Sequence, residues 1–267
     1  MQINFYKYHG AGNDFIMIDN RDKNLETSNR KLIERLCHRR FGIGADGLIT
    51  IEKTDKADFE MLYYNADGGL GSMCGNGGRC TVALAKRLEI FDSKTSFVAY
   101  DGIHDATILN YDDKNFNAEV SLQMNDVNDV EVNDDFIFLN TGSPHYIKFV
   151  HTLSNVDVIA DGRKVRYNDR FKSEGTNVNF IQYEGGRLVV RTYERGVEDE
   201  TLSCGTGVTA AAIAYAVHFN KTGNIEIPVK TLGGDLKVKL NNTGNHFKDI
   251  YLQGSATFVY KGVIEIK

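Results

Sequence analysis

Two stretches of the sequence decide the fold: Cys74-Gly-Asn-Gly-Gly-Arg-Cys-Thr-Val-Ala-Leu-Ala85 and Cys204-Gly-Thr-Gly-Val-Thr-Ala-Ala-Ala-Ile-Ala214. Each begins with Cys-Gly-x-Gly and continues into residues that favour a helix. They align at an offset of 130 residues between the two cysteines. A repeat of such long period indicates two halves that are built alike.

Three further matches support this duplication, because they occur in the same order along both halves. They are Gly12–Phe15 with Gly142–His145 at an offset of 130, Tyr64–Asn65 with Tyr193–Glu194 at 129, and Gly44–Ile49 with Thr176–Ile181 at 132. One match of this kind would be chance, whereas an ordered series predicts two similar lobes.

The coarse pattern of elements also repeats. Alternating or apolar runs predict strands at Phe59–Tyr64, Arg187–Tyr193, Phe136–Leu139, Ile225–Val229 and Leu236–Leu240. Helices are expected at Thr81–Leu88, at Val208–Phe219 with Gly223 near its C-cap, and at Asn24–Arg40. Many strands with one buried helix per half predict an α+β fold of two pseudo-symmetric lobes of mixed or antiparallel strands.

The domain boundaries follow from the same repeat. We expect an N-terminal lobe of residues 1–118, completed by a C-terminal strand at about 255–267, and a C-terminal lobe of residues 119–254. A length of 267 residues suits two such lobes. Regular β-α alternation of the kind found in dinucleotide-binding sheets is not visible.

Composition narrows the class of protein. The formal charge is −5, and no block of Lys and Arg suggests nucleic acid or an anionic membrane as a partner. The N-terminus lacks a signal-peptide profile, so we expect a cytoplasmic location. The four cysteines form no C-x2-C pair, which argues for free thiols and against a metal site. No motif for a cofactor is visible.

Cys74 and Cys204 are the candidate catalytic residues. Each lies at the predicted N-terminal turn of a helix, where orphan N–H groups and the helix dipole favour a thiolate. The glycines beside them allow those N–H groups to hold a carboxylate. Two lobes that face each other would place two thiols on opposite sides of one carbon. That arrangement suits racemisation or epimerisation by two bases.

The other cysteines have ordinary explanations. Cys37 and Cys80 have no counterpart in the repeat and are expected to be packing residues. His145 gains interest because it occupies a duplicated position. A thiol redox or metal-binding protein is the alternative from another class.

Five segments together resemble the diaminopimelate epimerase family across nearly the whole chain. They are Lys7–Phe15, Asn65–Gly68, Met73–Cys80, Tyr193–Gly196 and Ser203–Gly207. The resemblance implies a cofactor-free enzyme that interconverts LL- and meso-2,6-diaminopimelate, in lysine and peptidoglycan-precursor biosynthesis. It also implies a homodimer, strands wrapped around a central helix in each lobe, and a cleft between the lobes.

The resemblance assigns roles to individual residues. Cys74 and Cys204 become the acid and base, and His145 and Glu194 tune the two thiols. The expected substrate-binding residues are Asn13, Asn65, Gly75, Asn76, Asn177, Glu194, Arg195, Gly205 and Thr206.

Three departures from the family pattern concern the distal end of the substrate. Many relatives have Asn where Ser143 stands and some have Gln where Gly47 stands, and the stretch Val197–Thr201 is one residue longer than usual. Within the same fold, proline or hydroxyproline racemases and phenazine-type isomerases are the nearest rivals. The former tend to have His where Asn76 stands, and the latter lack the cysteine pair.

Overall fold

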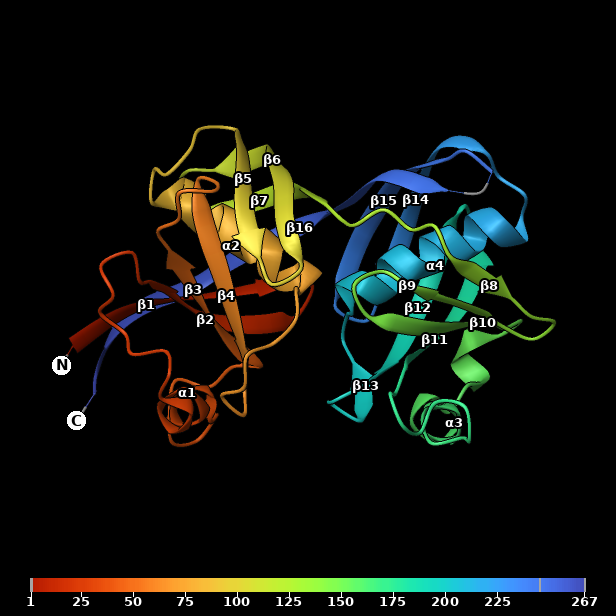
Figure 1. Ribbon diagram of the computed structural model, residues 1–267, viewed down its shortest axis with the longest axis horizontal. Helices are drawn as coiled ribbons and strands as arrows, with labels where there is room; N and C mark the ends of the chain where they lie inside the picture. Colours follow the sequence, from red (N-terminus) through yellow and green to blue (C-terminus); the bar gives the residue numbers. More distant parts are fainter. Residues whose placement is uncertain (1, 245, 267) are drawn as a thin grey trace. The chain divides into compact units, whose positions relative to one another are not determined.

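Strands dominate the chain, and their alternation of buried and exposed side chains gives each sheet an inner face. The computed structural model describes residues 2–244 and 246–266. They divide into two compact units, the first built from residues 2–122 and 254–266, the second from 123–253. The architecture is α+β with two similar units, as the repeat predicts (Figure 1).

The first unit is a closed barrel. Its strands are β1 (Gln2–Gly10), β2 (Asn13–Asp19), β3 (Gly47–Glu52), β4 (Phe59–Asn65), β5 (Lys94–Ala99), β6 (Gly102–Asp112), β7 (Asn117–Gln123) and the second part of β16 (Phe247–Glu265). They pair in that order, and β16 pairs again with β1. Closure leaves these eight strands without a free sheet edge.

The second unit is an open sheet. Its strands are β8 (Val130–Val132), β9 (Ile137–Asn140), β10 (Pro144–Phe149), β11 (Asn177–Glu184), β12 (Arg187–Glu194), β13 (Asp199–Thr201), β14 (Gly223–Thr231) and β15 (Gly234–Asn242). The order runs from β16 through β15, β14, β12, β11, β10 and β9 to β8, with β13 paired to β12.

One buried helix lies against the strands of each unit. In α2 (Gly75–Arg87) every residue from Gly75 to Ala85 is buried, and in α4 (Gly205–His218) every residue from Gly205 to Ala216 is buried. A helix that is buried on all sides needs strands around it. Accordingly, α2 packs on β1–β4 and β6, and α4 packs on β9–β12, β14 and β15 (Figure 1).

Two shorter helices complete the units. In α1 (Arg30–Cys37), Ile33, Leu36 and Cys37 are buried and join the cluster formed with Ile16 and Leu48. The second, α3 (Val158–Arg166), packs on β11 and β12, and a short 3₁₀ helix, η1 (Leu153–Asn155), precedes it. None of the helices among residues 2–244 and 246–266 is long and apolar enough to cross a membrane.

Several element boundaries differ from the expectations. The helix expected at Asn24–Arg40 covers only Arg30–Cys37, because Asn29 caps it by accepting a hydrogen bond from Leu32 N. The helix expected from Thr81 begins at Gly75, directly after Cys74. The residue after the C-cap Phe219 of α4 is Asn220, which is left-handed with φ 50°; Gly223, with φ 76°, begins β14 instead. Lys221 N donates to Ala216 O there, as in a Schellman ending.

Strand pairing settles the alignment of the two halves. Phe15 pairs with Gly47 between the parallel strands β2 and β3, and His145 pairs with Asn177 between β10 and β11. Both pairs keep the offset of 130, so the match at an offset of 132 is wrong. Similar apolar residues align at either register, and only the pairing distinguishes the two.

Candidate active site

Cys74 is the N-cap residue of α2. Its backbone is extended (φ −114°, ψ 117°), and its Sγ accepts a hydrogen bond from Gly77 N at 3.4 Å. The first backbone hydrogen bond of the helix runs from Gly78 N to Cys74 O, so the N–H groups of the first turn are not used by the regular helical ladder. The thiol therefore lies at the positive end of the helix dipole.

The Cys74 thiol also faces a carbonyl oxygen, since Cys74 Sγ lies 3.6 Å from Asn13 Oδ1. The orientation of this amide is fixed, because Asn13 Nδ2 donates to the Asp46 carboxylate at 2.8 Å. Asp46 is held by Arg39, which also pairs with Asp14. An oxygen that only accepts favours the protonated S–H form at Cys74.

A buried arginine lies behind the first turn of α2. The Arg79 side chain is fully buried, and its guanidinium donates to Gly75 O at 3.1 Å and to Asn76 Oδ1 at 2.9 Å. Asn76 Nδ2 in turn donates to Asn13 Oδ1 at 3.3 Å. Burial lowers the pKa of Arg79, and the neighbouring Cys80 and Cys74 act in the opposite direction.

Cys204 is the N-cap residue of α4 with nearly the same backbone (φ −115°, ψ 111°), but its polar neighbours differ. Cys204 Sγ lies 3.4 Å from Thr206 Oγ1, and Thr206 Oγ1 lies 2.9 Å from His145 Nε2. All three side chains are buried. Where Cys74 meets a carbonyl oxygen, Cys204 meets a hydroxyl that can donate.

His145 lies entirely inside the second unit. Burial, together with the positive charge of Arg195, lowers its pKa to about 3. The imidazole is therefore neutral at physiological pH and carries one ring hydrogen. Its Nδ1 lies 3.1 Å from Asn179 Nδ2.

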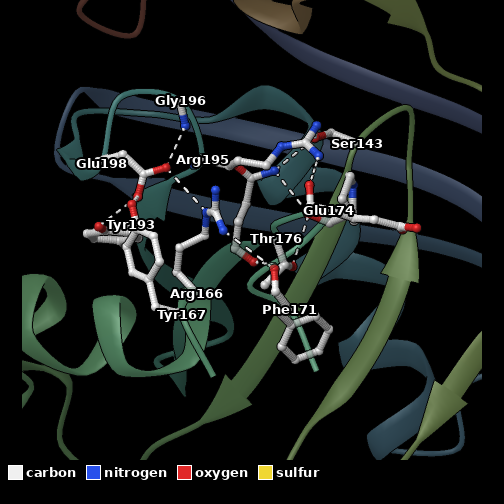
Figure 2. A network of polar contacts seen from close by, with 12 residues as sticks. Ser143, Arg166, Tyr167, Phe171, Glu174, Thr176, Tyr193, Arg195, Gly196 and Glu198 are labelled. Atoms are coloured by element: carbon white, nitrogen blue, oxygen red, sulfur yellow. Dashed lines mark hydrogen bonds and ion pairs between the residues drawn. The ribbon is translucent and has the colours of Figure 1, made fainter. Parts of the chain in front are cut away.

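Asn177 and Arg195 lie together at the ends of β11 and β12. Arg195 N donates to Asn177 Oδ1 at 2.9 Å, and Asn177 Nδ2 donates to Ser143 Oγ at 2.9 Å. The exposed Arg195 guanidinium donates to two neutral oxygens, Glu174 O at 2.9 Å and Ser143 Oγ at 3.4 Å (Figure 2). A guanidinium bound only to neutral groups keeps its charge available for a carboxylate.

A second arginine, Arg166, lies beside Arg195, but its charge is neutralised by the Glu198 carboxylate. Arg166 Nε donates to Glu198 at 3.3 Å, and Glu198 also accepts from Tyr193, Tyr167 and Gly196 N (Figure 2). Although burial acts to raise it, the Gly196 N–H and the tyrosine hydroxyls hold the pKa of Glu198 below its usual range. Glu198 belongs to the longer stretch Val197–Thr201, and its backbone is left-handed (φ 61°). This stretch thus brings the Glu198 carboxylate to Arg166.

Two more of the expected residues, Asn65 and Glu194, lie at strand ends. Asn65 ends β4, where its N–H donates to Gly69 O, and Glu194 ends β12, where it accepts from Thr201 Oγ1 at 2.8 Å. Gly205 is the first residue of α4. At Gly47 a Cβ would lie 2.5 Å from the Tyr63 ring, so Tyr63 fills the space of any longer side chain.

All four cysteines are free thiols. Burial raises the pKa of Cys37 to about 12, and it raises that of Cys80 still further. Both are therefore poor nucleophiles at neutral pH. Among residues 2–244 and 246–266, no group of three or more His, Cys, Asp or Glu side chains gathers in a way that could hold a metal ion.

Sequence reasoning missed four residues of these networks: Asp46, Arg79, Asn179 and Glu198. One signal could have indicated Asn179. It follows Asn177 by two positions in a strand, so both side chains point to the same face. Arg79 follows Gly75 and Asn76 by one helical turn, whereas Asp46 contacts Asn13 across 33 residues, which spacing does not reveal.

Comparison with known proteins identifies relatives along the whole chain. A family model for diaminopimelate epimerase matches residues 5–128 and 137–259. A curated protein of Flavobacterium psychrophilum named diaminopimelate epimerase is 51% identical over 263 residues, covering 98% of this chain and 100% of that protein. One of the same name from Chlorobaculum tepidum is 40% identical, covering 96% of this chain and 99% of that protein.

Solved structures share the fold at low sequence identity. A hydroxyproline epimerase from Agrobacterium vitis superposes with a TM-score of 0.73 at 13% identity, covering 98% of this chain and 92% of that one. A phenazine biosynthesis protein of the PhzF family from Bacillus anthracis gives 0.72 at 16%, covering 100% of both chains. At such identities the likeness shows the fold alone.

Proposed function

The chain belongs to the diaminopimelate epimerase family, and from that premise we propose that it interconverts LL- and meso-2,6-diaminopimelate. It is an isomerase of the epimerase kind. The observation that carries the substrate assignment is the relationship over 98% of the chain at 51% identity to a protein of that name. The pathway we propose for it is the synthesis of lysine and peptidoglycan precursors.

The mechanism we propose uses Cys74 and Cys204 as acid and base on one α-carbon. A thiolate removes the α-hydrogen as a proton from one face, forming an S–H bond, and the C–H electron pair remains on the substrate. The second thiol then donates its proton to the opposite face. After one turnover the protonation states of the two cysteines are exchanged, so each direction uses them in opposite roles.

Hydrogen-bond polarity supports an assignment of the resting state. Besides accepting from Gly77 N, Cys74 Sγ faces the acceptor Asn13 Oδ1, whereas Cys204 Sγ faces the hydroxyl of Thr206. We therefore propose Cys204 as the resting thiolate and Cys74 as the resting thiol. We propose that His145 contributes as a neutral hydrogen-bonding group, because burial and the charge of Arg195 lower its pKa to about 3. Glu194 is kept as a proposed tuning residue.

The substrate carboxylate at the reacting carbon would be held by N–H groups of the two helix N-termini, from Gly75, Asn76, Gly205 and Thr206. The distal amino-acid end would be bound by Asn13, Asn65, Asn177, Glu194 and Arg195. Two observations support this division: both helices begin directly after a cysteine, and among residues 2–244 and 246–266 the Arg195 guanidinium has neutral hydrogen-bond partners, Glu174 O and Ser143 Oγ.

Hydrogen exchange in deuterated water tests the reaction. With LL-diaminopimelate, the epimer formed at early times should carry solvent deuterium at its α-carbon, while recovered substrate carries little. The reason is that one cysteine removes the hydrogen and a different one donates the new hydrogen. Mass spectrometry of both epimers at low conversion measures how the deuterium is divided between product and recovered substrate.

L-Proline serves as the comparison substrate. Exchange with L-proline and none with LL-diaminopimelate would reject the substrate assignment. Equal early labelling of both diaminopimelate epimers would indicate a single base that exchanges with solvent, and would reject the cysteine pair.

The distal contact gives a second expected result. Arg195→Met should raise KM at least about tenfold, because it removes the cation proposed to bind the distal carboxylate. Arg166→Met is the matched control, since the Arg166 charge already pairs with Glu198. Steady-state kinetics of both variants should separate them, and an equal KM for Arg195→Met and wild type would contradict the role of Arg195.

We further propose, from the family resemblance, a cytoplasmic homodimer that needs no cofactor and binds only its small-molecule substrate at the site. Sedimentation velocity at assay concentrations measures the oligomeric state, and a monomer at those concentrations would contradict the proposal.

A further inference from the structure

A chain of buried polar side chains extends behind Cys204, beyond the residues considered so far. Thr192 Oγ1 donates to Asn179 Oδ1 at 2.9 Å, and Asn179 Nδ2 lies 3.1 Å from His145 Nδ1. His145 Nε2 then contacts Thr206 Oγ1 at 2.9 Å, and Thr206 Oγ1 contacts Cys204 Sγ at 3.4 Å. Every side chain in the series is buried, and Asn179 and His145 are completely so.

The orientation of the Asn179 amide determines the direction of each hydrogen bond in this series. Its Nδ2 also lies 3.2 Å from Tyr146 O, a backbone carbonyl that can only accept. The atom that faces Tyr146 O must therefore be the amide nitrogen. This leaves Oδ1 to accept from Thr192, so the amide has one favourable orientation.

The same amide determines the tautomer of His145. Because Asn179 Nδ2 donates toward Nδ1, this ring nitrogen must be the acceptor, and the single hydrogen of the neutral imidazole lies on Nε2. Nε2–H then donates to Thr206 Oγ1. Because Thr206 Oγ1 accepts this hydrogen bond with one lone pair, its own hydroxyl hydrogen can point at Cys204 Sγ, where it stabilises a thiolate.

We propose that Asn179, held by Thr192, is a positioning residue that keeps His145 as the Nε2–H tautomer and so makes Thr206 donate to Cys204 Sγ. The effect on epimerisation rests on the proposed function. The tautomer itself is a property of the resting protein and does not depend on the reaction.

The duplicated half supports a specific role. The strand pairing places Phe15, Ile49 and Tyr63 of the first unit where the second has His145, Asn179 and Thr192. Behind Cys74 the corresponding positions are therefore apolar or aromatic. Since the fold accommodates such residues at these positions, packing alone does not require a polar series behind Cys204.

The test uses two variants whose side chains have the same number of heavy atoms and the same branching as Asn179. In Asn179→Asp, a carboxylate faces Nδ1, so we expect the His145 hydrogen to move to that nitrogen. In Asn179→Leu no group fixes the tautomer. Two-bond ¹H–¹⁵N spectra of histidine-labelled protein report the ring state, with the His145 signal assigned through His145→Gln. The wild type should show the neutral Nε2–H pattern, unchanged between about pH 5 and 8.

Kinetics provide the second readout. We expect kcat to fall by about 10²-fold in both variants, with KM changed by less than about threefold, because the change concerns the base and not the binding groups. Asn224→Asp, an exposed position on β14, is the matched control and should behave as wild type. Circular dichroism and thermal melting confirm that each variant is folded.

Three results would overturn the proposal: a wild-type His145 with its hydrogen on Nδ1, an Nε2–H tautomer retained in both variants, or a shifted tautomer with unchanged kcat. If the wild type fails to epimerise diaminopimelate, the proposed function fails. The spectra of the resting protein still decide whether Asn179 fixes the tautomer.

Discussion

Cys74→Ala and Cys204→Ala should each lower kcat/KM for epimerisation by at least about 10³-fold, because inversion needs both a proton acceptor and a proton donor. The two variants should nevertheless keep a partial activity that a site without either cysteine would lack. Each keeps one thiol at a helix N-terminus, which can remove the α-hydrogen from one epimer and return a solvent hydrogen to the same face. We therefore expect exchange of the α-hydrogen with solvent without inversion, and we expect the two variants to act on different epimers.

Deuterium incorporation into LL- and meso-diaminopimelate, measured separately, distinguishes these outcomes. Cys37→Ala is the control, because Cys37 packs between α1 and the strands of the first unit with a pKa raised to about 12. It should keep most of the activity. If Cys37→Ala, shown to be folded, lost as much activity as Cys74→Ala, the assignment of the cysteine pair would be incorrect.

Local chemistry explains what the sequence could predict. A cysteine followed by glycines and then by helix formers specifies an N-cap, since capping depends on a few neighbouring residues. The duplication of that signal at Cys74 and Cys204 was enough to predict two similar units. The predicted strands also lie within observed strands or differ by one residue at an end, because alternation is a property of the segment itself.

Boundaries that depend on competing caps were harder to predict. The expected helix from Asn24 begins only at Arg30, because Asn29 supplies a cap and Leu25 N instead donates to Asn20 Oδ1. Both possibilities are consistent with the local composition. Only the fold of the preceding segment, which places Asn20 beside Leu25, decides between them.

The polar networks behind the cysteines depend on strand register, which spacing does not supply. Asn179 contacts His145 because β10 and β11 are parallel and pair His145 with Asn177. Asp46 orients Asn13 across a separation of 33 residues. A register shifted by two residues, as the alignment at an offset of 132 implied, would have placed different side chains beside His145.

The duplication supplies a matched pair of substitutions for the last expected result. Gly207 and Gly77 occupy the same position in the two helices. At Gly207 a Cβ would lie 2.5 Å from Asn179 Oδ1, and at Gly77 it would lie 2.9 Å from Ile49 Cδ1. The first neighbour is a buried amide fixed by hydrogen bonds to Thr192 and Tyr146, and the second is the end of a flexible apolar side chain.

Gly207→Ala should therefore displace Asn179, lower kcat by about 10²-fold and destabilise the fold by about 1–3 kcal/mol, since a rigid polar group cannot yield without losing its partners. Gly77→Ala should cost less in both quantities, because Ile49 can move by a few tenths of an ångström. Chemical denaturation and steady-state kinetics of both variants measure the difference. Equal effects would mean that the alanine acts through something the two halves share, such as the helix N-terminus, and not through the amide that orients His145.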